Sequence, residues 1–269
     1  MMSRVPDRQG GSRRLDDVVA AQAELTRSQA RGLILAGRVR VDGEPRTKAG
    51  ANVRAGAEVV VDSPARYVSR GGEKLEGALA AFAFDPAGLD ALDIGASTGG
   101  FTDCLLAHGA RAVTSLDVGY GQLAWRLRSD PRVTVLDRVN VRQLAPDQVA
   151  PAPSLVTADL SFISLTLVLP VLANCASPDA DFVLLVKPQF EVGKGRVGAG
   201  GVVRDPELRA AAVTRVASAA ADAGLGVAGI TASSLPGPAG NVEYFLWLRR
   251  GAPPLDLTRL DQAIAEGPE

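Results

Sequence analysis

Four ionisable residues stand where apolar segments of the chain begin or end. Asp159 and Lys187 directly follow predicted strands, Glu243 opens another, and Lys74 lies in a helix that leads into the first strand of the larger part. Burial of a charged side chain in such a place costs free energy unless the charge is paired or serves a function. Ionisable groups with shifted pKa values are also concentrated at active sites. Any one of the four could cap a helix or face water. Together they predict a catalytic set.

Residues 91–101 form the second stretch that could do chemistry. An apolar run leads into three closely spaced glycines, and an amphipathic segment follows. This order predicts a strand, a tight loop and a helix start, where an open α/β sheet binds its ligand. Glycines let backbone approach a ligand, and free N–H groups at the helix start favour an anionic group. The cofactor contacts expected here come from Asp93, Gly95, Ser97, Gly99, Gly100 and Phe101.

The spacing of this loop favours S-adenosylmethionine as the cofactor. Ser97 stands where the dinucleotide fingerprint G-x-G-x-x-G needs its second glycine, so a pyrophosphate is disfavoured. Asp117, after the next predicted strand, is placed for ribose hydroxyls. Asp137 and Asn140, after the third strand, are expected at the edge of the adenine. On these residues alone, an ordinary glycine-rich turn stays open as the alternative.

The composition limits the possible function classes. The 269 residues are 46% hydrophobic and 22% charged, which is typical of a globular chain with a large core. Cys104 and Cys175 are far apart and lack metal-ligand spacing, which predicts a cytoplasmic protein without a metal site. No signal peptide is expected, and polar residues interrupt the most apolar stretch, 160–176, which excludes a membrane partner. His108, the single histidine, is expected at a helix end rather than as a base.

The net charge of −1 hides an uneven distribution of charge. Residues 1–66 carry 12 Arg and Lys against 8 Asp and Glu, whereas the rest of the chain carries 17 against 22. The smaller part combines two short helices with small strands at 38–41 and 58–61. A basic module on an acidic body suggests a surface that faces nucleic acid. Its predicted RNA-binding residues are Arg14, Arg27, Arg31, Arg38, Arg40 and Arg46.

A long glycine-rich loop, over 190–204, carries two more candidate RNA contacts. Lys194 and Arg196 are expected near phosphates, because loops of this kind often carry binding residues. A solvated surface loop without such a role is the alternative.

Strand and helix signals alternate through the rest of the chain. This alternation, with continuous apolar strands, predicts an α/β fold with a mostly parallel sheet that is covered on both faces. Binding should lie at the carboxyl ends of the strands. The expected divisions are a disordered tail at 1–12, a small domain at 13–63, a linker at 64–70, a large domain at 71–250 and a tail or short terminal helix at 251–269.

Two sets of motifs resemble known families. Segments at 14–16, 28–30, 33–34, 37–39 and 41–43 follow the S4 RNA-binding domain pattern over about residues 13–62. The chain from 13 to 250 also resembles the TlyA (haemolysin A-like) family, which is related to FtsJ-type ribose methyltransferases. The motifs that carry this resemblance lie at 95–101 (GASTGGF), 117–123, 158–164, 186–191 and 240–245.

The resemblance implies a Rossmann-like S-adenosylmethionine-dependent methyltransferase sheet with an antiparallel last strand, joined to a small α+β S4 domain. The implied reaction is 2′-O-methylation of cytidine ribose in ribosomal RNA. The family's lysine–aspartate–lysine–glutamate tetrad matches Lys74, Asp159, Lys187 and Glu243. A ribose hydroxyl is a weak nucleophile, so the reaction needs positioning and proton removal. Lys187 is the expected base, since burial and a neighbouring lysine favour its neutral form, while the carboxylates orient the lysines and the hydroxyl.

Three other functions stay open. A small-molecule O-methyltransferase would leave the basic module without a role, and a non-catalytic RNA-binding assembly factor would not need the four-residue set. A haemolytic pore would need a signal or a membrane-length segment. The expected partners are ribosomal RNA and ribosomal subunits. The target cytidine, the subunit and the oligomeric state are left open.

Overall fold

The structure is a computed structural model that describes residues 12–23, 25–35, 37–61, 66–193 and 195–268. The chain divides into two units, residues 1–66 and residues 67–269, and each has a hydrophobic core of its own. Lys194 lies outside the described residues, as do residues 1–11 of the predicted tail and residues 64 and 65 of the predicted linker.

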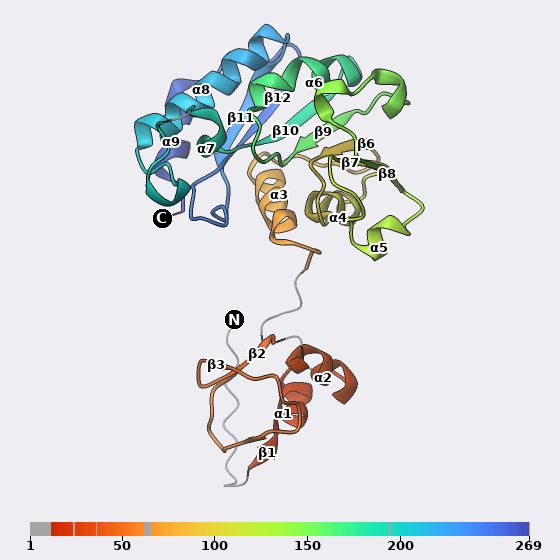
Figure 1. Ribbon diagram of the computed structural model, residues 1–269, viewed down its shortest axis with the longest axis vertical. Helices are drawn as coiled ribbons and strands as arrows, with labels where there is room; N and C mark the ends of the chain where they lie inside the picture. The colour runs from red at the N-terminus through yellow and green to blue at the C-terminus, as the bar shows by residue number, and fades with distance from the viewer. Residues whose placement is uncertain (1–11, 24, 36, 62–65, 194, 269) are drawn as a thin grey trace. The chain divides into compact units, whose positions relative to one another are not determined.

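Two helices pack on short antiparallel strands in the N-terminal unit (Figure 1). The predicted elements are present as α1 (Leu15–Gln22), α2 (Arg27–Leu35), β2 (Val39–Val41) and β5 (Val59–Val61). Three strands of two residues, too short to show any alternation, were not predicted: β1 (Arg13–Arg14), β3 (Glu44–Pro45) and β4 (Asn52–Val53). Leu15 and Ile34 are fully buried, which fixes the two helices against each other and the strands.

The larger unit is built on a seven-stranded sheet of order β11-β12-β10-β9-β6-β7-β8. Neighbouring strands are parallel except at β12, which is antiparallel to both β10 and β11. The prediction of a mostly parallel sheet with an antiparallel last strand is confirmed. The strands are β6 (Asp90–Ile94), β7 (Ala112–Asp117), β8 (Val133–Asp137), β9 (Leu155–Ala158), β10 (Asp181–Val186), β11 (Gly226–Ala232) and β12 (Tyr244–Arg249).

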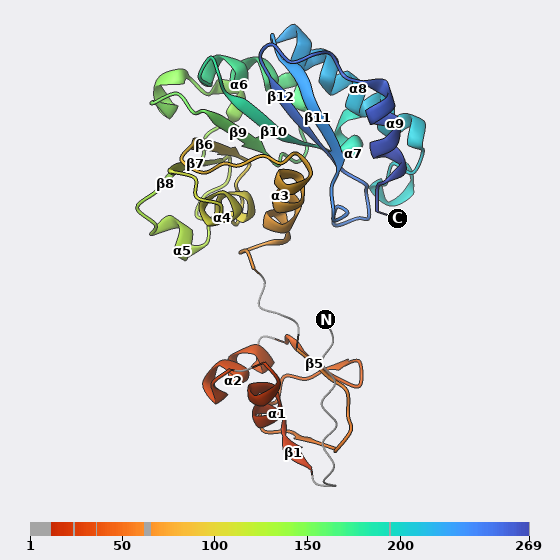
Figure 2. The ribbon, with the colours of Figure 1, turned by 180° about the vertical axis from the view of Figure 1, so that it is seen from behind.

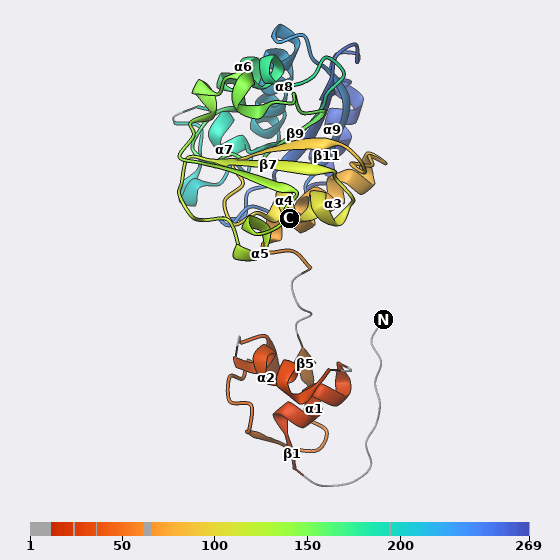
Figure 3. The ribbon, with the colours of Figure 1, turned by 90° about the vertical axis from the view of Figure 1, so that its right-hand side faces the viewer.

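Helices cover both faces of this sheet (Figures 1 and 3). One face carries α3 (Arg70–Ala81), α4 (Gly100–Ala107) and α5 (Trp125–Arg128), and the other carries α6 (Leu169–Cys175), α8 (Pro206–Asp222) and α9 (Leu257–Ala265). The short helix α7 (Pro188–Glu191) follows β10, and single 3₁₀ turns lie at Val141–Gln143, Pro146–Val149, Leu165–Leu167 and Ala199–Gly201. Helix α9 lies within the segment predicted as a tail or short terminal helix, 251–269, and its Leu260 is buried in the core. No helix in the described part of the chain is long and apolar enough to cross a membrane.

Local sequence explains where these elements begin and end. In α8, Pro206 occupies the first turn, the Asp205 side chain accepts a hydrogen bond from the Glu207 N–H at 2.9 Å, and Gly224 follows the helix with φ of +78°. Residues 182–186 are apolar and buried, because β10 lies in the middle of a sheet that is covered on both faces.

The strand order reverses between β6 and β9. The chain runs outward from β6 through β7 to β8, and then returns to β9 on the opposite side of β6 (Figure 2). Ligands of open α/β sheets bind in the crevice at such a reversal, outside the carboxyl ends of the strands. The glycine-rich loop follows β6 and Asp159 follows β9, so the fold brings both predicted sites to this crevice.

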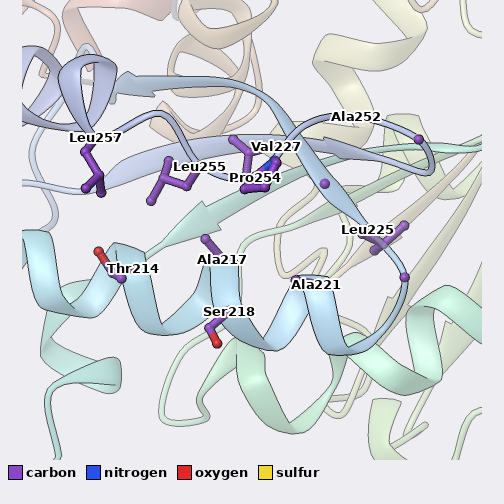
Figure 4. Close-up of a pocket in the computed structure, with 13 residues that line it drawn as sticks. Thr214, Ala217, Ser218, Ala221, Leu225, Val227, Ala252, Pro254, Leu255 and Leu257 are labelled. Carbon is purple, nitrogen blue, oxygen red and sulfur yellow. The ribbon is translucent and has the colours of Figure 1, made fainter.

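A hollow of about 510 Å³ lies away from the reversal, between α8, the start of β11 and the segment before α9 (Figure 4). Ala217, Leu225 and Leu255 are among its lining residues, and none of the described residues that line it is ionisable. It offers no group for acid–base chemistry.

Candidate active site

The four residues of the predicted catalytic set line one cavity of about 710 Å³. Lys74 comes from α3, Asp159 follows β9, Lys187 follows β10 and Glu243 precedes β12. The antiparallel direction of β12 explains the last position. Tyr244 pairs with Val186 in the sheet, so the residue before β12 meets the residue after β10.

Lys74 and Glu243 form an ion pair that is almost fully buried, which we call the closed pair. The Lys74 Nζ donates to Glu243 Oε2 at 2.5 Å, and the two side chains are only 8% and 1% exposed. The other carboxylate oxygen accepts a hydrogen bond from the Gln189 side-chain amide at 3.4 Å. A buried charge pair of this kind is costly to break, because removal of one partner leaves the other charge unpaired.

Lys187 and Asp159 form a second ion pair, which is more exposed and which we call the open pair. The Lys187 Nζ lies 2.5 Å from Asp159 Oδ1 and also donates to the Ser161 hydroxyl at 3.1 Å. The Asp159 side chain is 27% exposed, in contrast to the almost fully buried Glu243. Sequence reasoning missed Ser161, although it lies in the motif that contains Asp159.

The loop between Asp159 and the 3₁₀ turn at 165–167 presents an aromatic side chain to solvent. Phe162 has φ of +64°, a conformation that a non-glycine residue seldom adopts, and the residue is 92% exposed. The ring lies 5.2 Å from that of Phe190, centroid to centroid, and both line the cavity. The buried Glu191 carboxylate holds this loop by accepting bonds from the Ser164 hydroxyl at 2.5 Å and the Leu165 N–H at 2.8 Å. Burial raises the pKa of Glu191.

The glycines of the loop after β6 are required by contacts within the protein. Gly95 has φ of +79°, and a Cβ at this position would lie 2.8 Å from the backbone oxygen of Asp159. Gly99 has φ of +100°, and a Cβ there would meet the side chains of Leu123 and Leu127. Ser97 lies exposed between them with φ of +49°. Gly95 and Gly99 are therefore packed closely against neighbouring residues, whereas Ser97 and Thr98 between them are exposed.

Two residues predicted to contact the cofactor lie beneath this loop. Asp93 is fully buried, and its carboxylate accepts hydrogen bonds from Thr102 at 2.7 Å and Thr157 at 3.2 Å. Burial raises the pKa of Asp93 to about 6, although these hydrogen bonds oppose the shift. Phe101 is 3% exposed and packs on Phe245 with ring centroids 5.9 Å apart. Both side chains are buried beneath the loop, and their contact with the cofactor stays a prediction.

Two acidic residues, Asp117 and Asp137, end strands β7 and β8, and both have partners within the protein. Asp117 accepts hydrogen bonds from the Ser97 N–H at 2.8 Å and the Gly119 N–H at 2.7 Å, so it joins β7 to the glycine-rich loop. Asp137 pairs with Arg128 at 2.5 Å, which lowers its pKa. Asn140 accepts from the Arg142 N–H at 3.0 Å and caps a 3₁₀ turn. The adenine contacts of Asp137 and Asn140 stay predictions.

The arginines of the N-terminal unit divide into two groups. Arg14 and Arg27 pair with the buried Asp16 at 2.7 and 3.3 Å, and Arg14 lowers the pKa of that carboxyl by hydrogen bonding. These two therefore stabilise the unit whether or not they contact RNA. The other predicted RNA-binding residues of the unit are Arg31, Arg40 and Arg46, which are exposed, and Arg38, which is half-buried. In the larger unit Arg196 is exposed.

Residues 67–250, most of the chain, match the FtsJ-like methyltransferase family. The chain belongs to the FtsJ-like methyltransferase family. Residues 13–59 match the S4 domain. These two matches confirm the predicted pairing of an S4 domain with an FtsJ-type domain.

Two relatives and one solved structure to which this chain is similar support the prediction of a TlyA-type protein. The chain is 57% identical over 242 residues to the 16S/23S rRNA (cytidine-2′-O)-methyltransferase TlyA of Mycobacterium tuberculosis, covering 89% of this chain and 87% of that protein. It is 40% identical to Hemolysin A of Brachyspira hyodysenteriae, covering 86% of this chain and 97% of the relative. A solved structure from Streptococcus thermophilus is 38% identical, with a TM-score of 0.74 and 95% of each chain covered.

Proposed function

We propose that this methyltransferase uses S-adenosylmethionine to methylate the 2′-hydroxyl of a cytidine in ribosomal RNA. The observation that carries the proposal is the assembly of Lys74, Asp159, Lys187 and Glu243 in one cavity at the strand-order reversal, beside the glycine-rich loop. The names of the relatives support ribosomal RNA cytidine as the substrate, since the Mycobacterium tuberculosis relative is named for that reaction.

The residues around the loop after β6 suit S-adenosylmethionine. The Asp117 carboxylate uses two of its lone-pair positions on backbone N–H groups and keeps others for ribose hydroxyls. Ser97 and Thr98 lie exposed at the middle of the loop, between positions where glycine is required, so backbone there is open to a ligand. The partly exposed Asp159 would lie toward the positively charged sulfonium. When bound, S-adenosylmethionine supplies an electrophilic methyl group.

The chain's own residues then act on the ribose hydroxyl. Lys187 belongs to the open pair and is our candidate to accept the hydroxyl proton, with Ser161 and Asp159 fixing its Nζ. Its ammonium group must first release a proton to solvent, so that the neutral amine can take the proton of the 2′-hydroxyl as the methyl group is transferred. Lys74 and Glu243, paired and almost fully buried, form a fixed pair of opposite charges beside that site. Fixed groups of this kind stabilise a transition state without reorganising, since they are already in place.

The S4 domain supplies the RNA-binding surface in this proposal. Arg31, Arg40 and Arg46 are exposed and can contact phosphates, together with Arg196 of the larger unit. Such contacts release counterions from RNA, so affinity should fall steeply as salt increases.

The test is to map 2′-O-methylated positions in ribosomal RNA after incubation of ribosomal subunits with the chain and S-adenosylmethionine. The proposal predicts a new 2′-O-methylcytidine that is absent with the Asp159→Asn variant. Methylation of a base atom, or no methylation of either subunit, would contradict it. Calorimetry with S-adenosylmethionine provides a separate readout: Asp117→Ala should weaken binding at least tenfold through lost ribose contacts. Gly95→Val is a poorer probe, because its Cβ already clashes with the Asp159 backbone.

A further inference from the structure

One side chain of the cavity has a hydrogen-bonding group that the protein does not use. Gln189 lies in α7, two residues after Lys187, and its Nε2 donates to Glu243 Oε1 at 3.4 Å. Its carbonyl oxygen, Oε1, is buried and has no hydrogen-bond partner among the described residues. A flipped amide would bring this oxygen against a carboxylate oxygen, so the contact with Glu243 fixes which end of the amide is free.

The second amide of the cavity provides a contrast. Asn241 is 2% exposed, and its Oδ1 accepts from the Val203 N–H at 2.9 Å while its Nδ2 donates to the Gly201 carbonyl at 2.9 Å. Both ends of this amide hold the loop that contains residues 201–203. Gln189 therefore differs from its neighbour, because only one end of its amide serves the fold.

A buried acceptor without a donor from the protein is uncommon, and its partner is then an ordered water or a donor on a ligand of the cavity. This step rests on the proposed function. Within an RNA chain the 3′ and 5′ oxygens of a nucleotide are esterified, so a cytidine offers only two donors: the 2′-hydroxyl and the exocyclic N4 amine. The single proton of the 2′-hydroxyl is committed to the base, Lys187. The N4 amine is then the donor that remains for Gln189.

We propose that Gln189 is a specificity-determining residue whose carbonyl oxygen accepts a hydrogen bond from the N4 amine of the target cytosine. Uracil presents a carbonyl at the same ring position, so two acceptors would face each other and one would be left unpaired. The hydrogen bond between Gln189 and Glu243 thus links the predicted catalytic set to recognition of the base. The carboxylate orients the amide, and the amide selects cytidine.

The experiment measures kcat/KM for two ribosomal RNA transcripts, assembled into subunits, that carry C or U at the position located by the mapping described above. The wild-type chain should favour C, and Gln189→Leu should lower the ratio of C to U turnover about tenfold, mainly through loss on C. Asn241→Ala is the matched control. It loosens a loop of the same cavity, so it should lower both rates and leave their ratio unchanged.

Two results would overturn the inference. The first is a Gln189→Leu variant that loses activity equally on both transcripts, as expected if this residue only supports Glu243 or the ribose. The second is a wild-type chain that methylates C and U equally well. In both cases a 2′-O-methyl product still forms, so the proposed function survives, whereas complete absence of that product would reject both proposals.

Discussion

The two ion pairs of the cavity combine the same residue types in different surroundings. Lys74 and Glu243 are 8% and 1% exposed, and the second carboxylate oxygen is occupied by Gln189. Lys187 and Asp159 are 11% and 27% exposed, and Lys187 has a hydroxyl as its other partner. Only the open pair can exchange its internal contacts for contacts with a substrate. The closed pair is a fixed, net-neutral pair of opposite charges, and the two pairs should respond differently to mutation.

The largest effect is expected from breaking the open pair. Asp159→Asn keeps the shape of the side chain but removes the charge that holds Lys187. Methyl transfer should fall by about 100- to 10,000-fold, the usual range for a misplaced general base, while the free energy of unfolding changes by less than about 1 kcal/mol. Rates from radiolabelled cofactor and urea unfolding curves would check this. A variant that unfolds easily yet retains its rate would reverse the assigned roles.

For the closed pair we expect a large effect on the free energy of unfolding. Glu243→Ala leaves a buried ammonium unpaired, so we expect a loss of about 3–5 kcal/mol in the free energy of unfolding, measured in urea. The exposed pair Arg132–Asp130, at 2.8 Å, is the control, and Asp130→Ala should cost less than about 1 kcal/mol. Equal losses in the two variants would mean that burial does not distinguish these pairs.

Another buried carboxylate, Asp93, extends the comparison because its hydrogen-bond partners among the described residues are the Thr102 and Thr157 hydroxyls and the Thr102 backbone, with no cation. Its pKa is about 6 in the folded chain, above the ordinary value, so the folded state binds a proton more tightly than the unfolded state. Protonation of Asp93 stabilises the fold fully at pH values below its unfolded-state pKa of about 4. This stabilisation is lost as pH rises through the folded-state pKa of about 6. Wild type should therefore lose about 2 kcal/mol relative to Asp93→Asn between pH 4 and 7.5, as measured by chemical unfolding.

The control for this titration has the opposite sign. Arg132 lowers the pKa of Asp130, so Asp130 stabilises the fold above its unfolded-state pKa and this contribution is lost as pH falls. A flat difference between wild type and Asp93→Asn over the same range would mean that this carboxyl does not titrate differently in the folded chain.

The smallest of these effects is expected at the second partner of Lys187. Ser161→Ala removes one neutral hydrogen bond and leaves the ion pair with Asp159. The rate of methyl transfer should fall about twofold to tenfold, with unfolding unchanged within about 1 kcal/mol. A loss as large as that of Asp159→Asn would show that the hydroxyl, and not the carboxylate, positions Lys187.

Much of the fold could be predicted because its strands are continuous apolar runs. Residues 155–158 and 182–186 have no alternation, which indicates strands buried on both faces, and the residues directly after them had to reach the same edge of the sheet. The catalytic set followed from that rule. The pairing within the set did not, because it depends on β12 running antiparallel beside β10, which brings Glu243 to Lys74 and leaves Asp159 for Lys187.

The burial of side chains around the glycine-rich loop could not be predicted from the sequence. Asp93 and Phe101 were expected to contact the cofactor because they flank the glycines, but sequence adjacency does not give direction. Asp93 lies inside β6 and Phe101 lies on the side of α4 that faces the sheet core, so both point inward. The Gln189 carbonyl without a donor among the described residues could not be predicted either, since it depends on the contact of the amide with Glu243, 54 residues along the chain.

The most direct test of the account compares Lys187→Ala and Lys187→Arg in single-turnover methyl transfer, with saturating ribosomal RNA and cofactor. Arginine keeps the positive charge and can still pair with Asp159, but it cannot give up its proton near neutral pH. If Lys187 accepts the hydroxyl proton, both variants should be slower than wild type by at least about 100-fold, with S-adenosylmethionine affinity unchanged. An arginine enzyme with a rate near that of wild type would show that this position only balances charge, and would contradict the assignment of Lys187 as the base.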